Sequence, residues 1–184
     1  NTDLIFTILK SGDFREDSGL YFSYGEFTAL LNVDWNSINF NKLPNVNFYA
    51  SSFAGGASGY PLMFDNYSEK DQINIKQKNK EFSFLKRCNM LDKIKPNYFM
   101  PYAGFFYNKL KRDARIQKLN SKNSIKDYSK FCERKNIEIL NVDKYDIFEF
   151  DDKKLLNKIV NKNKKYKDIS EIDFLKYFKK IFHP

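Results

Sequence analysis

Apolar residues in the first half of the chain come in short runs separated by turn-forming residues. Runs rich in β-branched and aromatic side chains are typical of strands. The pair Gly25-Glu26 lies between two of these runs, which predicts a β-hairpin there. We therefore expect a mainly antiparallel or mixed sheet built from strands over residues 4–9, 20–24, 27–33, 46–53 and 97–103.

Residues 68–95 have the spacing of a helix instead. Apolar side chains recur at helical intervals from Ile73 to Ile94, the period that turns one face towards a core. Ser68 predicts the N-cap, because its hydroxyl can accept a hydrogen bond from a free backbone N–H of the first turn. Pro96 has no N–H and predicts the end of the helix. We expect this helix, over 69–94, to pack on one face of the sheet.

Beyond residue 108 the pattern predicts a different, mixed arrangement. Strands over 137–142 and 145–150 are expected to form a hairpin that turns at Asp143-Lys144. Helices are expected over residues 120–135, 151–162 and 170–182. The chain is thus divided into residues 1–108 and an α+β extension over 109–184.

Charge separates the same two parts. Residues 1–108 carry 11 Lys and Arg against 11 Asp and Glu, whereas residues 109–184 carry 21 against 12, so the whole net charge of +9 lies in the extension. A basic segment can bind nucleic acid or an acidic membrane surface. The alternative, which we favour, is that lysine is abundant for the same reason as Asn, Ile, Phe and Tyr, namely AT-rich codons. We expect at most weak, salt-sensitive and sequence-independent binding of nucleic acid.

Composition also limits the chemistry. With 42% hydrophobic residues among 184 the chain is globular, and no apolar run is long enough to span a membrane. The start at Asn1, directly before an apolar run, suggests a piece of a longer polypeptide. Cys88 and Cys132 are expected to be reduced, partly buried thiols of a cytoplasmic protein, with a disulfide as the alternative. The single histidine, His183, excludes a His-rich metal site or a Ser-His-Asp triad within this chain.

The segment 51–61, Ser-Ser-Phe-Ala-Gly-Gly-Ala-Ser-Gly-Tyr-Pro, follows a predicted strand. Glycines permit positive φ and close approach of a ligand, and successive backbone N–H groups in such a loop can form an anion-binding nest. A tight structural turn is the alternative. The spacing fits neither the dinucleotide nor the Walker pattern.

Three strand ends in this chain form a recognisable order. One predicted strand ends in Leu-Asn-Val-Asp-Trp-Asn, the next ends in Phe-Ala-Gly-Gly-Ala-Ser-Gly-Tyr-Pro, and a third, after a Lys-Pro turn, ends in Met-Pro-Tyr-Ala-Gly-Phe-Phe. This order over residues 1–108 resembles the second half of a metallo-β-lactamase fold. The residue sequences of the last two motifs resemble those of the CMP-N-acetylneuraminate hydroxylase group within that superfamily. The resemblance implies an α/β fold, the second half of an αββα sandwich.

The resemblance also implies roles for single residues. Asp34 matches the strand-end aspartate that binds metal, and Tyr102 stands where many members place their last histidine. The remaining members of a substrate site would be Ser52, Gly55, Gly56, Ser58 and Tyr60, with Trp35 as a further aromatic that could stack on a base or sugar ring. For Asp34 the alternative is a turn cap with Asn36, and for each aromatic it is a place in the core. Asp13, Arg15, Glu16 and Asp17 are candidate cleft residues or else a solvated loop.

Several parts implied by the resemblance are missing from this chain. The His-x-His-x-Asp-His cluster belongs to the first half of the fold, and the cysteine–histidine pattern of a Rieske domain is also missing. Iron or zinc would therefore take most of its ligands from outside this chain, and an iron–sulfur cluster would require a separate N-terminal domain. The expected partner is the missing N-terminal half of the same polypeptide, which would cover an apolar sheet face that is otherwise open.

Three classes of function follow from these features. The first is part of an oxygenase, hydroxylase or hydrolase acting on a nucleotide sugar such as CMP-sialic acid. The second is a non-catalytic module that binds a sugar nucleotide or a partner protein, which the tyrosine at 102 favours. The third, a nucleic-acid-binding protein, rests only on the basic extension and lacks a helix-turn-helix, RNP or zinc-finger signature.

Overall fold

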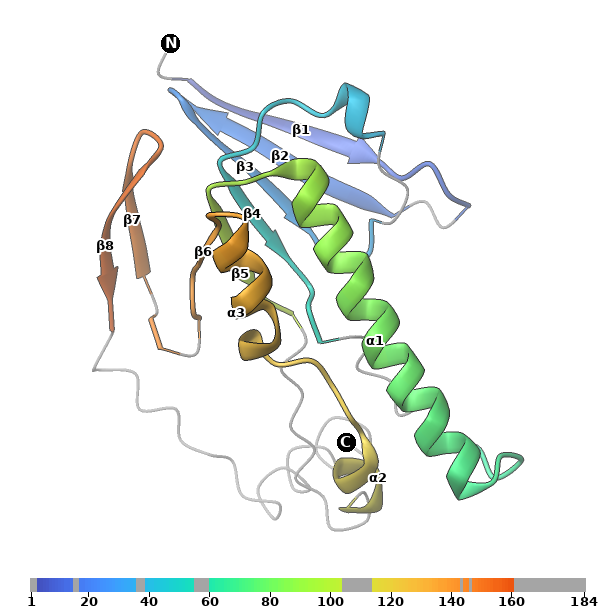
Figure 1. The fold of residues 1–184 in the computed structure, drawn as a ribbon. Coiled ribbons are helices and arrows are strands. Elements are labelled where there is room, and N and C mark those ends of the chain that lie inside the picture. The colour runs from blue at the N-terminus through green and yellow to red at the C-terminus, as the bar shows by residue number, and fades with distance from the viewer. Residues whose placement is uncertain are drawn as a thin grey trace, which may run out of the picture.

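A computed structural model describes residues 3–14, 17–35, 39–54, 60–103, 114–142, 144–145 and 147–160. Its main feature is a six-stranded mixed sheet in which the strands follow one another in chain order (Figure 1). The strands are β1 (Leu4–Lys10), β2 (Ser18–Tyr24), β3 (Phe27–Asn32), β4 (Phe48–Ser51), β5 (Tyr98–Pro101) and β6 (Glu138–Ile139). The pairs β1–β2 and β2–β3 are antiparallel, and the pairs from β3 to β6 are parallel. All five strands predicted in residues 1–108 are confirmed, as is their place in one mixed sheet.

The long helix α1 (Glu69–Ile94) has the bounds that the sequence predicts. Ser68 caps it by accepting a hydrogen bond from the Asp71 backbone N–H, 3.2 Å away. Lys95 ends the helix in the left-handed conformation, with φ at 51°, directly before Pro96. The cap satisfies a backbone donor and the proline removes the next one, so both ends are determined locally.

The main core lies between α1 and the sheet (Figure 1). Helix α3 (Ile125–Arg134) packs on the same face, where the buried Tyr128 and Cys132 join residues of α1 and of the central strands. The predicted helix over 120–135 is therefore confirmed in its second part. A short helix α2 (Ala114–Leu119) and a 3₁₀ turn η1 (Phe40–Lys42) were not predicted.

A second hairpin covers part of the opposite sheet face. It consists of β7 (Ile147–Asp151) and β8 (Lys154–Ile159) (Figure 1). The Phe150 ring lies 4.9 Å from that of Phe27 and 5.2 Å from that of Tyr98, centroid to centroid. This is a satellite apolar cluster on the far side of the sheet from α1.

Two predictions for this region are wrong. Residues 137–142 and 145–150 do not form a hairpin, because β6 pairs in parallel with β5 while β7 pairs with β8. Residues 151–162 do not begin a helix, because 154–159 form β8. The aromatic sheet face decides both: Phe148 and Phe150 alternate inward along β7 and pack on it, so tertiary packing overrides local propensity. Asp152 takes a φ of 45° in the turn, a conformation that Asp tolerates. The predicted helix over 170–182 lies outside the described residues.

The same sheet face is open next to its edge strand. Leu4, Phe6 and Ile8 of β1 point to this face, with exposed fractions of 52%, 60% and 76%. Phe6 pairs with Phe22, which pairs with Ala29 and so continues the row into the buried cluster. Within the described part of the chain, the expected open apolar face is therefore present. A second sheet of the size that an αββα sandwich requires is not among the described residues, and the sandwich stays a prediction.

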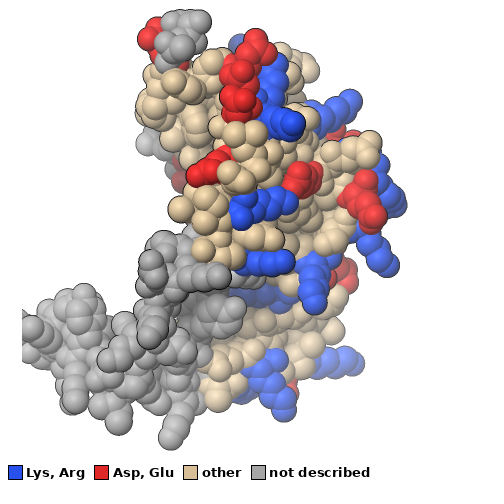
Figure 2. All heavy atoms as spheres, turned by 90° about the vertical axis from the view of Figure 1, so that its left-hand side faces the viewer, with Lys and Arg blue, Asp and Glu red and all other residues tan. Residues whose placement is uncertain are grey.

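Charges on the hairpin side of the molecule are mixed. Figure 2 shows lysine and arginine side chains interspersed with aspartate and glutamate there. Lys153, in the turn of the hairpin, pairs with Glu26 at 2.5 Å, and Lys158 of β8 pairs with Glu138 of β6, so exposed ion pairs connect the hairpin turn and β8 to the sheet side. Such pairs contribute little stability. No helix among the described residues is long and apolar enough to cross a bilayer.

Candidate functional site

The carboxyl ends of β3, β4 and β5 meet at one edge of the sheet. These strands are parallel and in register, with Asn32 beside Ser51 and Ser51 beside Pro101. The residues that follow them, Asp34, Ser52 and Tyr102, therefore lie at the same edge. Asp34 and Tyr102, two of the site residues suggested by the sequence, thus lie at one edge of the sheet, whereas Gly55, Gly56 and Ser58 lie outside the described residues. We call Asp34, Ser52 and Tyr102 the edge residues.

Backbone and side-chain hydrogen bonds hold Ser52 and Tyr102 in place. The Ser52 N–H donates to the Asn32 carbonyl at 3.2 Å, and the Tyr102 N–H donates to the Ser51 carbonyl at 3.0 Å. The Ser52 hydroxyl donates to the Val33 carbonyl at 2.9 Å. These bonds prolong the parallel ladder past the strand ends, so the edge residues are positioned by the sheet itself.

Tyr102 is half-buried beside charged groups of both signs. Burial raises the pKa of its hydroxyl, the neighbouring Tyr49 and Asp34 raise this pKa further, and the Arg87 guanidinium lowers it. The Tyr102 ring itself packs against the apolar cluster on the hairpin side of the sheet. The phenol stays protonated at neutral pH and can donate a hydrogen bond.

Arg87 is a residue of this region that the sequence analysis missed. It comes from α1 and is buried beneath the edge, with an exposed fraction of 8%. Its Nη1 donates to the Tyr49 hydroxyl at 2.5 Å, and its Nη2 donates to the Ser52 hydroxyl oxygen at 3.2 Å. One signal was available: Arg87 lies among Phe84, Cys88 and Leu91 on the apolar stripe of a helix, where an arginine is out of place unless it is paired.

Trp35 and Tyr60, both suggested as stacking partners of a ligand, lie in different surroundings. Trp35 belongs to the core, because it is 4% exposed and its indole N–H donates to the Lys10 carbonyl at 3.1 Å. The stacking role suggested for it is wrong. Tyr60 is exposed and packs in its own cluster: its hydroxyl lies 3.3 Å from that of Tyr67, and its ring meets Phe64 edge-on at 5.3 Å. Nothing in the described residues tests whether Tyr60 binds a substrate.

The described residues do not by themselves hold a metal. Asp34 is exposed at the edge, but no group of three or more His, Cys, Asp or Glu side chains comes together among the described residues. Iron and zinc sites usually need at least three protein ligands. A metal at Asp34 would therefore need further ligands from outside the described residues.

The remaining candidates have structural roles. Cys88 and Cys132 are free thiols, as predicted, and both are buried more completely than expected. Burial raises the pKa of Cys88 to about 11 and that of Cys132 to about 12, which makes them inert. Asp17 closes the loop after β1, where its carbonyl accepts from the Ser11 N–H at 2.8 Å, and the Asp13 N–H lies 3.5 Å from the Ser11 hydroxyl. Arg15 and Glu16 lie outside the described residues.

Comparison with known proteins gives one group of relatives. No protein-family profile matches the chain, and no solved structure matches it. The cytidine monophosphate-N-acetylneuraminic acid hydroxylase of Danio rerio is 32% identical over 125 residues, which cover 66% of this chain. The proteins of the same name from Asterias rubens and Pongo pygmaeus are 30% and 27% identical, over 67% and 75% of this chain.

The match covers most of this chain but a small part of each relative. The aligned segments make up 21% of the Danio rerio protein, 19% of the Asterias rubens protein and 24% of the Pongo pygmaeus protein. The chain thus spans about a fifth of the length of the curated relatives it matches. Over two thirds of its own length, this chain is homologous to a segment of these hydroxylases.

Proposed function

We propose that this chain forms one wall of the substrate site in a hydroxylase that acts on a nucleotide sugar such as CMP-sialic acid. The observation that carries the proposal is the similarity to proteins named as hydroxylases of that compound. The edge residues support it, since a carboxylate, a hydroxyl and a protonated phenol at the carboxyl ends of parallel strands form a typical ligand-binding position.

Each edge residue has a role in this proposal. Tyr102 donates a hydrogen bond to the sugar or base and offers its ring for stacking. Ser52 has a lone pair left to accept from the ligand, because its proton is used on the Val33 carbonyl. Asp34 contributes one carboxylate to an iron or zinc site whose other ligands come from outside the described residues. The glycines and Ser58 of segment 51–61 contribute backbone N–H groups to an anionic group of the substrate.

The rest of a longer polypeptide is the partner in this proposal. The relatives are about five times as long as the segment matched here, and β1 exposes large apolar side chains on one sheet face. Exposed apolar surface of this kind is typical of an interface. The polypeptide outside this chain would cover that face and supply the missing metal ligands.

The proposal is tested with the full-length protein, CMP-N-acetylneuraminic acid, dioxygen and an added reductant. One oxygen atom enters a C–H bond of the substrate and the other leaves as water, so mass spectrometry should find a product one oxygen heavier. Asp34→Ala should abolish product formation while binding of the nucleotide sugar persists. Asp65→Ala, an exposed aspartate in the turn before α1, is the matched control and should keep the wild-type rate.

Other results would change the assignment. Product formation by Asp34→Ala at the wild-type rate would remove Asp34 from the metal site. A wild-type protein that binds the nucleotide sugar without turnover would be the non-catalytic module instead, which is the second candidate. The tyrosine at 102 favours that candidate, since a neutral phenol is a poor metal ligand. Failure to bind the nucleotide sugar at all would refute both.

A further inference from the structure

The guanidinium of Arg87 is a buried charge in the described structure, with an exposed fraction of 8%. Its donor atoms contact only neutral groups there: the hydroxyls of Tyr49 and Ser52, and the Met90 sulfur at 3.2 Å. Its Nε is buried without a hydrogen-bond partner. None of the ion pairs found among the described residues includes Arg87.

A buried charge of this kind is costly when no opposite charge offsets it. Desolvation of an ion costs several kcal/mol, about the amount that good pairing returns, and hydroxyl partners return only part of it. The neighbouring Asn32 adds to the imbalance. It is 1% exposed, its Nδ2 donates to the Tyr49 hydroxyl at 3.4 Å, and its Oδ1 is buried without a partner. The hydrogen-bond partners of this buried positive charge are therefore all neutral groups among the described residues.

The Arg87 guanidinium lies next to the edge residues. Through its bond to the Ser52 hydroxyl, Arg87 touches one of them directly, and its field acts on the Tyr102 hydroxyl. Tyr49, which holds Nη1, is a β4 residue with no exposed surface. The guanidinium thus lies directly beneath the edge, on the helix side of the sheet.

We infer that Arg87 positions Ser52 and supplies the positive charge that draws an anionic group of the ligand to this edge. Because Arg87 is nine-tenths buried, it acts on the ligand through its field while it holds Ser52 from below, and it is a positioning residue. The ligand is an oxyanion, either the phosphodiester or the sugar carboxylate of a nucleotide sugar. The inference rests on the proposed function, and deepens it by naming the group that the edge recognises.

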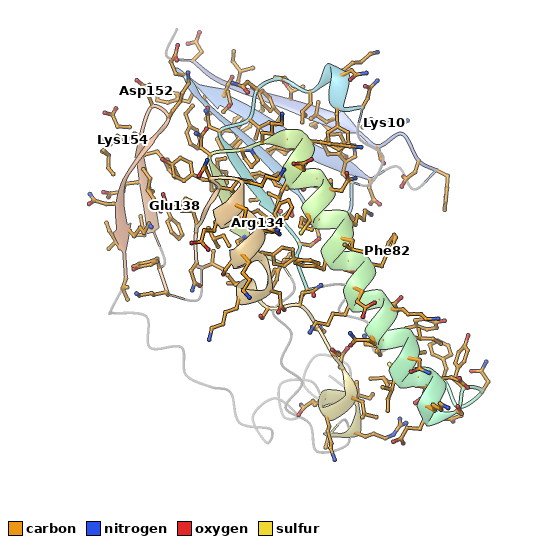
Figure 3. The ribbon with its side chains drawn as sticks, viewed as in Figure 1. Lys10, Phe82, Arg134, Glu138, Asp152 and Lys154 are labelled. Atoms are coloured by element: carbon orange, nitrogen blue, oxygen red, sulfur yellow. The ribbon has the colours of Figure 1, made fainter. Side chains whose placement is uncertain are left out.

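The test compares two variants with a control in the full-length protein. Arg87→Gln keeps hydrogen-bond donors but removes the charge, and Arg87→Lys keeps the charge but cannot hold Tyr49 and Ser52 together. Arg134→Gln is the control, since Arg134 is exposed on α3 and bonds only to the Lys130 carbonyl of its own helix (Figure 3). Melting temperature shows which variants are folded, and calorimetric titration gives their affinities.

The ligands are CMP-N-acetylneuraminic acid, CMP, which has the phosphate alone, and N-acetylneuraminic acid, which has the carboxylate alone. Arg87→Gln should weaken binding of the nucleotide sugar about tenfold to hundredfold, the range for a hydrogen bond to a charged group, and Arg87→Lys less. A matching loss for CMP alone identifies the phosphodiester, and one for N-acetylneuraminic acid alone identifies the carboxylate. A structural role would weaken all ligands equally, so equal losses, or none, overturn the inference.

Two further outcomes are also decisive. If Arg87→Gln does not fold, Arg87→Lys should still bind several-fold more weakly than wild type to one of the two part-ligands, and wild-type affinity for both overturns the inference. If the wild-type protein does not bind the nucleotide sugar, the proposed function fails by itself, and inorganic phosphate becomes the probe. Phosphate binding that is lost in the Arg87 variants then supports the inference, whereas no binding, or equal binding, refutes it.

Discussion

Gly19 is the position where a single methyl group should do the most damage. A Cβ built there would lie 2.6 Å from Cε3 of Trp35 and 3.0 Å from its Cδ2, closer than carbon atoms pack. Neither side can give way easily. The Trp35 indole is buried and bonded to the Lys10 carbonyl, and β2 is paired on both sides. We therefore expect Gly19→Ala to destabilise the fold by about 1–3 kcal/mol, the usual range for an overpacked core.

Denaturant unfolding followed by circular dichroism gives the free energy, and a thermal scan gives a second estimate. For a domain of this size the loss corresponds to a melting point lower by about 2–12 °C. Ser18→Ala, at the exposed neighbouring position of β2, is the control and should change stability by less than about 0.5 kcal/mol.

A second substitution separates the contact with Trp35 from strand propensity. In a Trp35→Leu background, the smaller side chain leaves room, so Gly19→Ala should cost much less there than in the wild type. An unchanged cost in that background, or a Gly19→Ala protein as stable as the wild type, would refute the reasoning.

Two further predictions concern the open sheet face and the buried thiols. In the full-length protein, Ile8→Lys should lower the free energy of unfolding by about 1.5–3 kcal/mol if another segment covers the open sheet face. The control, Ile73→Lys at a 42% exposed position of α1, should lower it by less than about 0.5 kcal/mol. Equal effects of the two substitutions in unfolding experiments would show that the sheet face is free. Burial raises the pKa of Cys88 to about 11 and that of Cys132 to about 12 from 9.0, so the unfolded state loses these protons first and stability should fall as pH rises from about 9 towards 12. A Cys88→Ala, Cys132→Ala double variant should lose that part of the alkaline decline, and an unchanged pH profile would contradict the assignment.

Local signals in the sequence are sufficient to predict the strands and the long helix of the first hundred residues. The bounds of α1 follow from a serine that satisfies a free N–H and a proline that cannot donate one, together with the helical period between them. The five strands follow from short β-rich runs with turn residues between them. Both features depend on contacts within a few residues, which is why the pattern predicts them.

The sequence also predicts that each edge residue follows a strand, but position in the chain does not by itself determine that these residues meet in space. Asp34, Ser52 and Tyr102 each follow a strand in the sequence, and their meeting at one edge depends on β3, β4 and β5 being parallel and in register. Trp35 shows the limit of that reasoning. It stands next to Asp34 in the chain, yet its indole points into the core against Gly19.

The hairpin of β7 and β8 and the buried Arg87 were decided by tertiary structure alone. The segment 151–162 has a helix-like spacing, but an aromatic face formed by distant strands offers more burial to a hairpin. The place of Arg87 on the apolar stripe of α1 indicates burial, but its partners Tyr49 and Ser52 lie 38 and 35 residues away in the sequence and only the folded strands bring them to it. The sequence by itself determined which elements form, because capping, period and turn chemistry are local. Which surfaces those elements share, and which charge is buried between them, depends on long-range contacts that no short stretch of sequence contains.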